Sequence, residues 1–366
     1  MPKPIHVAYL CEFPTLLGGE RSLLAFLTHR AEAAVRPIVV APAGGRLAAA
    51  LAEAGIERID WPKDGRHDAG ALADVLRDRS IDIVHANSLM TVAAASAVGD
   101  VLGIPAVAHV RDIMTLSAAQ RDRINRLAGV VAVSDAVAER LAAQGIDRQR
   151  ITRIYNAIDL DRMQRNATPG TFRRELAVGN DRLVGCIGQI ALRKGQDLFL
   201  DAAARVAGQI ADARFVIAGE RYSNKPESRA FEADLVERAN TPPLACRTHL
   251  LGYRDDIPSL LTDLDVLVVP SRQEPLSRVL LEGLATGAAA VATAVGGTPE
   301  ILVEGEHGLM VPPDDPERMA EAITRLLGNP SMCDKMRTAG PPRAREMFSP
   351  PRQIEALRKL YDRIMK

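Results

Sequence analysis

Short apolar segments alternate with longer amphipathic segments along most of the chain. The apolar segments are rich in Val, Ile and Ala and nearly continuous, which predicts parallel strands covered by helices on both faces. The amphipathic segments have the spacing of helices that bury one face. The expected strands are 5–11, 37–41, 81–86, 106–110, 130–134, 183–188, 214–219, 264–270 and 288–293, and the expected helices include 21–32, 45–54, 91–102, 136–144 and 198–210.

This alternation occurs twice, which predicts an α/β protein of two Rossmann-like domains with doubly wound parallel sheets. Residues 162–170 interrupt it with Arg, Asn, Thr, Pro and Gly, so we place the interdomain linker within 159–179. The expected domains are 1–165 and 166–345, followed by a C-terminal helix, 346–366, that could pack back on the first domain. A length of 366 residues suits two domains better than one.

Composition narrows the functional class. Lys and Arg together number 46, as do Asp and Glu, and the resulting zero net charge argues against sequence-independent nucleic-acid binding. The four cysteines lack the spacing of zinc ligands. No apolar run reaches the ~18–20 residues of a membrane span, and no signal-peptide pattern is visible. We therefore expect a cytoplasmic protein with reduced cysteines.

A glycine pair follows the first expected strand. Gly18 and Gly19 precede an amphipathic helix, where backbone amides and the helix dipole could approach an anion. Glycine pairs also serve turns that bind no ligand, so this pair alone does not distinguish a phosphate site from a turn.

The strongest chemical signal follows the strand expected at 264–270. There, Glu274 lies in a polar loop and Glu282 on the helix that follows. Amides of Leu276 and Ser277 at the start of this helix suit a diphosphate. Glu274 could accept hydrogen bonds from sugar hydroxyls, and Glu282 could hold the paired hydroxyls of a ribose. On spacing alone, both carboxylates could equally be solvated surface groups.

Two glutamates with seven residues between them, after a strand that ends in Pro-Ser, resemble the signature of retaining glycosyltransferases of family 4 (group 1), which have the GT-B fold. The resemblance spans essentially the whole chain. It implies two domains that face each other across a cleft and move a sugar from a nucleotide-diphosphate sugar to an acceptor hydroxyl. Six further segments agree with the family in order and spacing: Gly18–Glu20, His109–Asp112, Ile154–Asp159, Arg193–Gly195, Gly252–Asp256 and Gly296–Glu300.

The resemblance implies a role for each matching residue. Lys194, helped by Arg193, would neutralise charge on the leaving nucleotide. His109 would bond the transferred sugar and steady positive character at its anomeric carbon, and His85 is a weaker candidate at the end of another strand. Glu274 would position the donor. The other expected donor-binding residues are Gly18, Gly19, Gly188, Gln189, Tyr253, Arg254, Leu276, Ser277, Arg278, Glu282, Gly297 and Thr298.

Retention in this family is explained by front-side attack, in which the leaving phosphate takes the acceptor's proton. Such a reaction needs no covalent intermediate, so Glu274 is not expected to be a nucleophile. We predict that no cofactor and no metal is required. Two Asp-x-Asp sequences, 159–161 and 263–265, look like the metal motif of the other major glycosyltransferase fold. Neither lies at the carboxyl end of a cleft strand, so we interpret both as chance.

The chain departs from the family pattern at two positions near the expected phosphates. Gly188-Gln189 stands where the family usually has Gly-Arg, so Arg193 or Arg278 would have to replace a phosphate-binding arginine. Ser277 stands where glycine is usual and narrows the space beside the phosphates.

The substrates are less readable than the reaction class. We favour a UDP-sugar over GDP-mannose, and an acceptor in cell-envelope or exopolysaccharide glycan or glycolipid synthesis. One alternative is a UDP-sugar 2-epimerase of the same fold, which would need no acceptor. Another is a non-catalytic nucleotide-sugar-binding module, which Gln189 alone suggests.

An arginine-rich stretch raises the question of membrane contact. Arg111, Arg121, Arg123 and Arg126 lie in or beside the amphipathic segment 116–127 and could rest on anionic lipid at the inner face of the plasma membrane. A solvated arginine-rich helix is the simpler interpretation.

Overall fold

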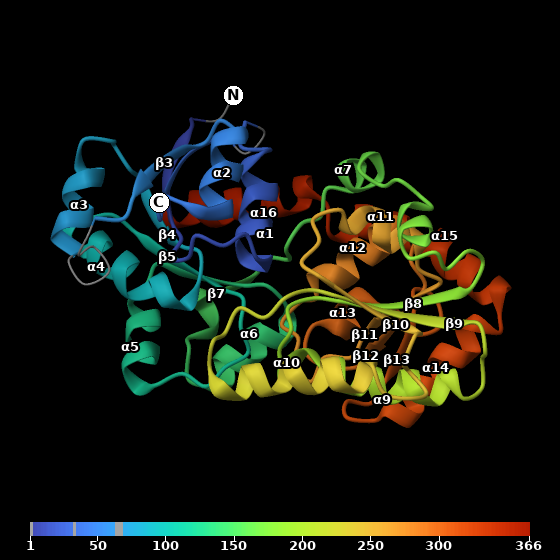
Figure 1. Ribbon diagram of the computed structural model, residues 1–366. Coiled ribbons are helices and arrows are strands. Elements are labelled where there is room, and N and C mark those ends of the chain that lie inside the picture. Colours follow the sequence, from blue (N-terminus) through green and yellow to red (C-terminus); the bar gives the residue numbers. More distant parts are fainter. Residues whose placement is uncertain (1–2, 32–33, 63–68) are drawn as a thin grey trace. The chain divides into compact units, whose positions relative to one another are not determined.

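The computed structural model describes residues 3–31, 34–62 and 69–366. The chain forms two compact units, Met1–Ile158 with Phe348–Lys366, and Asp159–Met347. Each unit is built on one sheet (Figure 1). The division follows Ile158 rather than residue 165. The stretch expected to be a linker holds two short helices of the second unit, α7 (Leu160–Arg165) and α8 (Thr171–Glu175).

The sheet of the first unit has the strand order β3-β2-β1-β4-β5-β6-β7, and every neighbouring pair is parallel. The chain order reverses between β1 and β4. Open parallel sheets bind ligands at such a switch point, outside the carboxyl ends of the strands. The strands are β1 (Ile5–Leu10), β2 (Val35–Ala41), β3 (Glu57–Asp60), β4 (Ile83–Ala86), β5 (Ala106–Val110), β6 (Gly129–Ala132) and β7 (Ile151–Arg153).

The C-terminal helix α16 (Pro350–Ile364) belongs to the first unit and lies among its N-terminal elements (Figure 1). Its residues Leu357 and Tyr361 share one core with residues of α1 and α2 and with one face of the sheet. The other helices of this unit are α1 (Gly18–Leu27), α2 (Gly45–Glu53), α3 (Ala69–Arg77), η1 (Leu89–Thr91), α4 (Val92–Leu102), α5 (Ala118–Arg126), α6 (Asp135–Ala143) and η2 (Arg148–Arg150).

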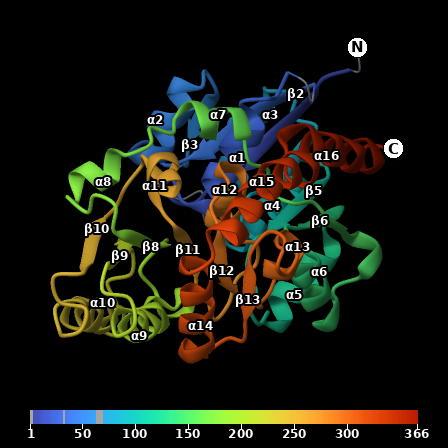
Figure 2. The same ribbon diagram turned by 90° about the vertical axis from the view of Figure 1, so that its right-hand side faces the viewer.

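The sheet of the second unit has the order β10-β9-β8-β11-β12-β13 and is also parallel, with its switch point between β8 and β11. Figure 2 shows α9 and α14 on one side of this sheet and α11 and α12 on the other. The strands are β8 (Arg182–Ile187), β9 (Ala213–Ala218), β10 (Thr248–Gly252), β11 (Val266–Val269), β12 (Ala290–Thr293) and β13 (Leu309–Val311). The helices are η3 (Leu192–Lys194), α9 (Gln196–Ala207), α10 (Pro226–Ala239), α11 (Ile257–Asp263), α12 (Arg278–Thr286), α13 (Thr298–Ile301), α14 (Pro316–Leu327) and α15 (Pro330–Met347).

The predicted α/β fold class is confirmed, and each expected strand is present with small shifts at its ends. The sequence analysis missed β3, β7, β10 and β13, which are the edge strands of the two sheets. An edge strand is covered less completely, and β3, β7 and β10 consist largely of exposed or half-buried residues, so they lack the continuous apolar run of a central strand. The helix expected at 21–32 ends at Leu27, and Glu32 lies outside the described residues.

Candidate functional site

In the first unit, Arg111 joins the loops at the carboxyl ends of several strands. Its Nη2 lies 3.1 Å from Asn87 Oδ1 and 3.1 Å from His109 Nδ1, and its Nη1 donates to Asn156 Oδ1. A Cβ atom on Gly19 would lie 3.3 Å from the Arg111 Cδ, so the glycine pair packs directly on this side chain. The expected residues Gly19 and His109 are therefore brought together, with Arg111 between them.

The protonation of His109 follows from this contact. A guanidinium group can only donate, so His109 Nδ1 accepts and the ring proton lies on Nε2. Burial of the ring, followed by the nearby charge of Arg111 and by His85, lowers the pKa of His109 well below its usual value. The ring is therefore neutral at pH 7. Its Nε2 is buried and has no partner among the described residues, which leaves one unused N–H donor.

The structure corrects the interpretation of Arg111 as part of a lipid-facing patch. Its guanidinium is turned inward to Asn87, His109 and Asn156, because these groups offer it acceptors at the ends of the strands. The other three arginines do lie on α5, which the Ser117 side chain caps. None of the helices in the described part of the chain is long and apolar enough to cross a membrane.

The glycine pair forms the first turn of α1, as its position predicts. Glu20 closes this turn by accepting the Leu17 amide on its Oε2 at 3.1 Å. Burial raises the pKa of Glu20. One acidic group already occupies this helix start, so the binding of a phosphate by Gly18 and Gly19 stays a prediction.

In the second unit, Lys194 and Glu274 form an ion pair that is largely shielded from water. Lys194 Nζ lies 2.5 Å from Glu274 Oε2, and Ser271 Oγ donates to the same oxygen at 3.0 Å. The two side chains are 19% and 4% exposed. Shielding from water strengthens their attraction relative to a surface pair, and the added hydroxyl helps to offset the cost of burial.

The loop that carries Lys194 is tied to the loop that carries Glu274. Gly195 has a φ of +70°, and a Cβ atom on it would lie 2.0 Å from the Pro270 carbonyl oxygen. The Arg193 carbonyl accepts hydrogen bonds from the amides of Arg272, at 2.8 Å, and Gln273, at 3.3 Å. The close approach requires glycine at position 195, and it holds the Lys194 loop against the start of the loop segment that follows β11.

The structure separates the two candidates for the missing arginine. Arg193 Nη2 donates to Gln189 Oε1 at 3.2 Å, so its guanidinium lies directly beside the glutamine that stands where the family usually has arginine. Arg278 instead lies with its Nε 2.8 Å from Glu282 Oε1, one helical turn away on α12. Arg278 therefore accompanies the expected ribose ligand, and Arg193 accompanies position 189.

Ser277 caps the helix that follows Glu274. Its Oγ accepts the amide of Leu280 at 3.3 Å, and the residue is fully buried. A serine at this position thus supplies a side-chain hydrogen bond to the start of the helix, which a glycine could not, rather than only narrowing the space. Leu276 is also buried beside it.

The remaining glycines and Thr298 line the same edge of the second sheet. The Gly297 amide donates to the Glu274 carbonyl at 3.0 Å, so these two predicted residues are adjacent. The Thr298 hydroxyl is buried without a partner among the described residues. Gly188 lies against Gly219, where a Cβ atom would come within 1.8 Å of the Gly188 carbonyl oxygen. The close packing between these loops therefore requires glycine at position 219.

The Arg254 side chain is engaged within the second unit. Its guanidinium forms ion pairs with Glu175, at 2.9 Å, and Asp256, at 2.8 Å, and lies 4.6 Å from the centroid of the Phe172 ring. The side chain therefore stabilises the second unit. The contact of the Tyr253–Arg254 loop with a base, largely through its backbone, stays a prediction.

Both Asp-x-Asp sequences serve the fold. Asp263 accepts the amides of Phe172, at 2.8 Å, and Arg173, at 3.3 Å, and Asp265 accepts the Leu183 amide at 2.7 Å. Asp159 caps α7. These carboxylates have structural partners, and the expectation of a metal-independent reaction stays a prediction.

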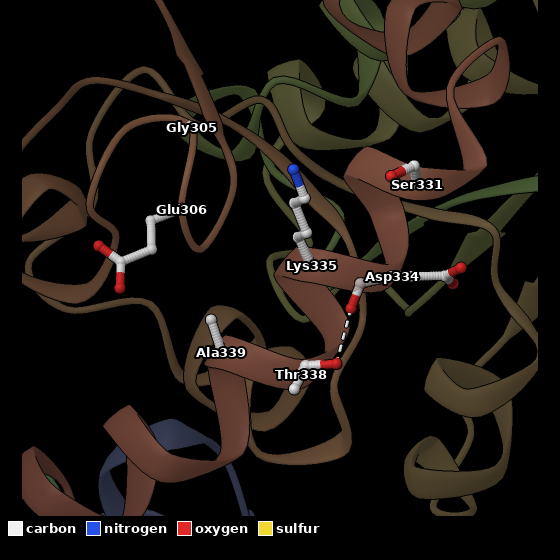
Figure 3. Close-up of a pocket in the computed structure, with 7 residues that line it drawn as sticks. All are labelled: Gly305, Glu306, Ser331, Asp334, Lys335, Thr338 and Ala339. Atoms are coloured by element: carbon white, nitrogen blue, oxygen red, sulfur yellow. Dashed lines mark hydrogen bonds between the residues drawn. The ribbon is translucent and has the colours of Figure 1, made fainter.

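A separate open hollow lies on the second unit (Figure 3). The Thr338 hydroxyl there donates back to the Asp334 carbonyl of its own helix at 2.8 Å. The hollow is formed by α15 and by the turn at Gly305 and Glu306, and it includes none of the predicted site residues. It is lined by Gly305, Glu306, Ser331, Asp334, Lys335, Thr338 and Ala339.

Four residues of these clusters were not predicted as site residues: Asn87, Arg111, Asn156 and Ser271. Asn87 follows β4 at the switch point, and the other three lie inside segments already singled out for the resemblance. Position at a strand end was therefore an available signal. The sequence alone does not show that Asn87, Arg111 and Asn156 contact one another in the folded chain.

Two family models match the chain. The model for Glycosyltransferase Family 4 matches residues 17–162, and the model for Glycosyl transferases group 1 matches residues 181–329. Each match therefore covers one of the two switch-point clusters, including Gly19, Arg111 and His109 in the first and Lys194 and Glu274 in the second.

Individual proteins agree with these family matches. The chain is 30% identical to an alpha-maltose-1-phosphate synthase of Mycolicibacterium smegmatis, over 77% of this chain and 79% of that protein. It is 28% identical to a lipopolysaccharide core biosynthesis mannosyltransferase, LpsB, of Rhizobium meliloti, over 66% of this chain and 68% of that protein. The fold is similar to that of Anabaena HepE in complex with UDP-glucose, with a TM-score of 0.86, 20% identity and 98% of each chain covered.

Proposed function

The chain belongs to the family 4 (group 1) glycosyltransferases, and we propose that it transfers a sugar, with retention, from a nucleotide-diphosphate sugar to an acceptor hydroxyl. The observation that carries this proposal is the largely buried Lys194–Glu274 ion pair beside the start of α12. A carboxylate that can bind sugar hydroxyls and an ammonium that can bind phosphate lie side by side at a switch point. Such neighbours suit a site where a sugar–phosphate bond breaks, because the ammonium can stabilise the charge that develops on the phosphate.

Charge on the leaving nucleotide is the main barrier that this second-unit cluster can lower. Lys194 has three N–H donors, one of which points to Glu274, so it can donate to a phosphate oxygen as well. Arg193, oriented by Gln189, supplies the second positive group in place of the usual arginine. The capped start of α12 adds backbone amides, and Glu282 with Arg278 would hold the ribose.

Glu274 would position the donor sugar rather than attack it. Its Oε2 already accepts from Lys194 and Ser271, which lowers the nucleophilicity of that oxygen. The other carboxylate oxygen can accept from a sugar hydroxyl. Front-side attack, with the leaving phosphate as the base, then gives retention without a covalent sugar–enzyme bond and without a metal.

His109 would act as a neutral donor. Because Arg111 fixes its proton on Nε2, the ring can donate a hydrogen bond to an oxygen of the transferred sugar and hold the sugar in place for the reaction. A pKa held far below 7 prevents a positive imidazolium, which would oppose the developing positive charge of the sugar.

We favour a UDP-sugar donor, because HepE was solved with UDP-glucose and shares the fold along nearly the whole chain. A glycan or glycolipid acceptor of the cell envelope is supported by the lipopolysaccharide mannosyltransferase among the relatives. Contact of α5 with anionic lipid would suit a lipid-linked acceptor and a peripheral cytoplasmic location.

Thermal shift with UDP, GDP, ADP and their common sugar conjugates tests the donor site, first with chelator and then with Mg²⁺. A ligand at 100 times its Kd should stabilise the protein by about 2.7 kcal/mol. We expect UDP and a UDP-sugar to raise Tm equally with and without metal. The absence of any shift would overturn the proposal.

Product analysis tests the reaction itself. Proton NMR of the product made with the stabilising donor should show the same anomeric configuration as the donor. Inversion would contradict the retaining mechanism. Interconversion of the UDP-sugar in the absence of an acceptor would instead identify the epimerase alternative.

A further inference from the structure

A buried line of polar side chains connects the C-terminal helix to the histidines of the first unit. The Tyr361 hydroxyl on α16 lies 2.7 Å from His85 Nδ1 and 3.0 Å from the Tyr9 hydroxyl. These three residues are at most 1% exposed. The His85 ring also packs on the His109 ring, with centroids 5.5 Å apart. A residue near the end of the chain thus reaches the immediate neighbour of His109.

The available donors and acceptors determine which group donates in each hydrogen bond of this line. If Tyr9 donates to Tyr361 and Tyr361 donates to His85 Nδ1, each hydroxyl proton has an acceptor and the His85 proton lies on Nε2. In the reverse direction, the Tyr9 proton would have no acceptor among the described residues, and His85 Nε2 would become a buried acceptor without a donor. The first direction leaves fewer unpaired buried groups and is therefore more stable.

The ring contacts of His85 and its hydrogen bond with the Tyr361 hydroxyl restrict different motions of the ring. Its ring centroid lies 5.1 Å from that of Tyr9 and 5.9 Å from that of Tyr361, and these contacts restrict the ring plane. They do not prevent a half-turn of the ring. The bond from Tyr361 does, because a half-turn would place a carbon against the hydroxyl.

We propose that Tyr361 is a positioning residue for sugar transfer: its hydroxyl fixes the tautomer and rotation of His85, and the fixed ring holds His109 in the orientation that presents Nε2–H to the substrate. The inference rests on the proposed function. It assigns the C-terminal helix a role in the reaction in addition to its role in the core.

The two histidines are arranged as a pair. His85 pairs in register with Val107, two positions before His109, so both side chains project from the same face of the sheet. Each ring is held from its Nδ1 side, His85 by Tyr361 and His109 by Arg111. In each ring the Nε2 atom is the one without a partner among the described residues. Burial lowers the pKa of His85 to about 3, which keeps this ring neutral as well.

Tyr361→Phe is the direct test, because it removes only the central hydroxyl. We expect kcat to fall about tenfold while KM for the nucleotide-sugar changes less than about twofold, since a loosened His109 affects the reacting state more than binding. Tyr9→Phe is the matched control. It removes a buried hydroxyl from the same line but leaves the Tyr361–His85 bond, so kcat should stay within about twofold of the wild type.

Histidine nitrogen NMR separates positioning from general loss of stability. Wild-type His85 and His109 should both appear as Nε2–H tautomers, and Tyr361→Phe should convert His85 to a tautomer mixture that Tyr9→Phe does not produce. A wild-type His85 protonated on Nδ1 would overturn the inference, even if Tyr361→Phe failed to fold. Equal kcat losses in the two variants, with an unchanged His85 tautomer, would also overturn it.

The tautomer measurement distinguishes failure of this inference from failure of the proposed function. The tautomers are measured in the protein without substrate, whereas a wild-type protein that binds no nucleotide would contradict the glycosyltransferase proposal itself.

Discussion

Lys194 Nζ lies 2.5 Å from Glu274 Oε2, so two groups that the sequence assigned to different parts of the donor form one ion pair. The Glu274 side chain is 4% exposed, and Ser271 satisfies it further. Removal of the lysine would leave a buried carboxylate without its countercharge, which is costly. The catalytic and structural roles of Lys194 must therefore be measured separately.

Lys194→Ala should lower kcat by about 10²-fold or more, because the charge on the leaving nucleotide loses its nearest cation. Initial rates at saturating donor, together with a circular dichroism melt, would separate this effect from unfolding. Lys335→Ala is the matched control, since Lys335 is an exposed lysine of α15 in the hollow of Figure 3. A folded Lys194→Ala protein with wild-type kcat would contradict the assignment.

The neutral histidines predict how stability depends on pH. Unfolded histidines take up protons below a pKa of about 6.5, whereas burial holds the pKa of folded His109 well below that value. The unfolded state then binds more protons, so the free energy of unfolding falls as pH decreases from about 6.5. The slope is ~1.4 kcal/mol per pH unit for each such histidine.

His109→Gln should remove its share of this slope. In urea unfolding at several pH values, the difference in free energy between wild type and variant should be constant above about pH 6.5 and should shrink below it. His85 contributes in the same direction down to its folded pKa of about 3, so the variant keeps part of the dependence. Parallel curves throughout would show that His109 titrates normally.

The central strands and the catalytic loops could be predicted from sequence because both are local patterns. A continuous apolar run marks a strand buried on two faces, as in β5 and β11. Glu274 and Glu282 are singled out by their spacing together with the family resemblance, because the spacing alone also allows two solvated surface groups. Edge strands such as β3 are half-exposed and carry no such run, so their existence depends on their neighbours.

Long-range pairs could not be predicted in the same way. Arg111 sits in an arginine-rich context that favours a surface interpretation, and its inward role depends on acceptors from Asn87 and Asn156, far away in sequence. Tyr361 is separated from His85 by 276 positions. Only the packing of α16 in the core of the first unit reveals their contact.

Arg193→Ala tests the replacement of the phosphate-binding arginine. The Kd for UDP should rise about tenfold, since one charged hydrogen bond to phosphate is lost, while the Kd for uridine should not change. Calorimetry with both ligands measures this. Arg278→Ala should weaken both ligands, because Arg278 holds the expected ribose ligand Glu282. Equal losses of uridine and UDP in Arg193→Ala would contradict a phosphate role.

Gly195→Ala tests whether the close contact between the Lys194 loop and the Glu274 loop sets the position of Lys194. A methyl group there would lie 2.0 Å from the Pro270 carbonyl oxygen, and the residue also has a φ of +70°. Gly179→Ala is the matched control, with a φ of +54° and open space around the added atom. The control should lower the free energy of unfolding by only about 1–2 kcal/mol, because alanine is strained in the left-handed backbone conformation.

Gly195→Ala should cost more than this control and should also lower kcat, because relief of the clash must move η3 away from the end of β11 and so part Lys194 from Glu274. Urea unfolding and initial rates, measured on both variants, compare the two effects. If both variants lost equal stability and Gly195→Ala kept the wild-type kcat, the close approach to Pro270 would not be what sets the Lys194–Glu274 distance.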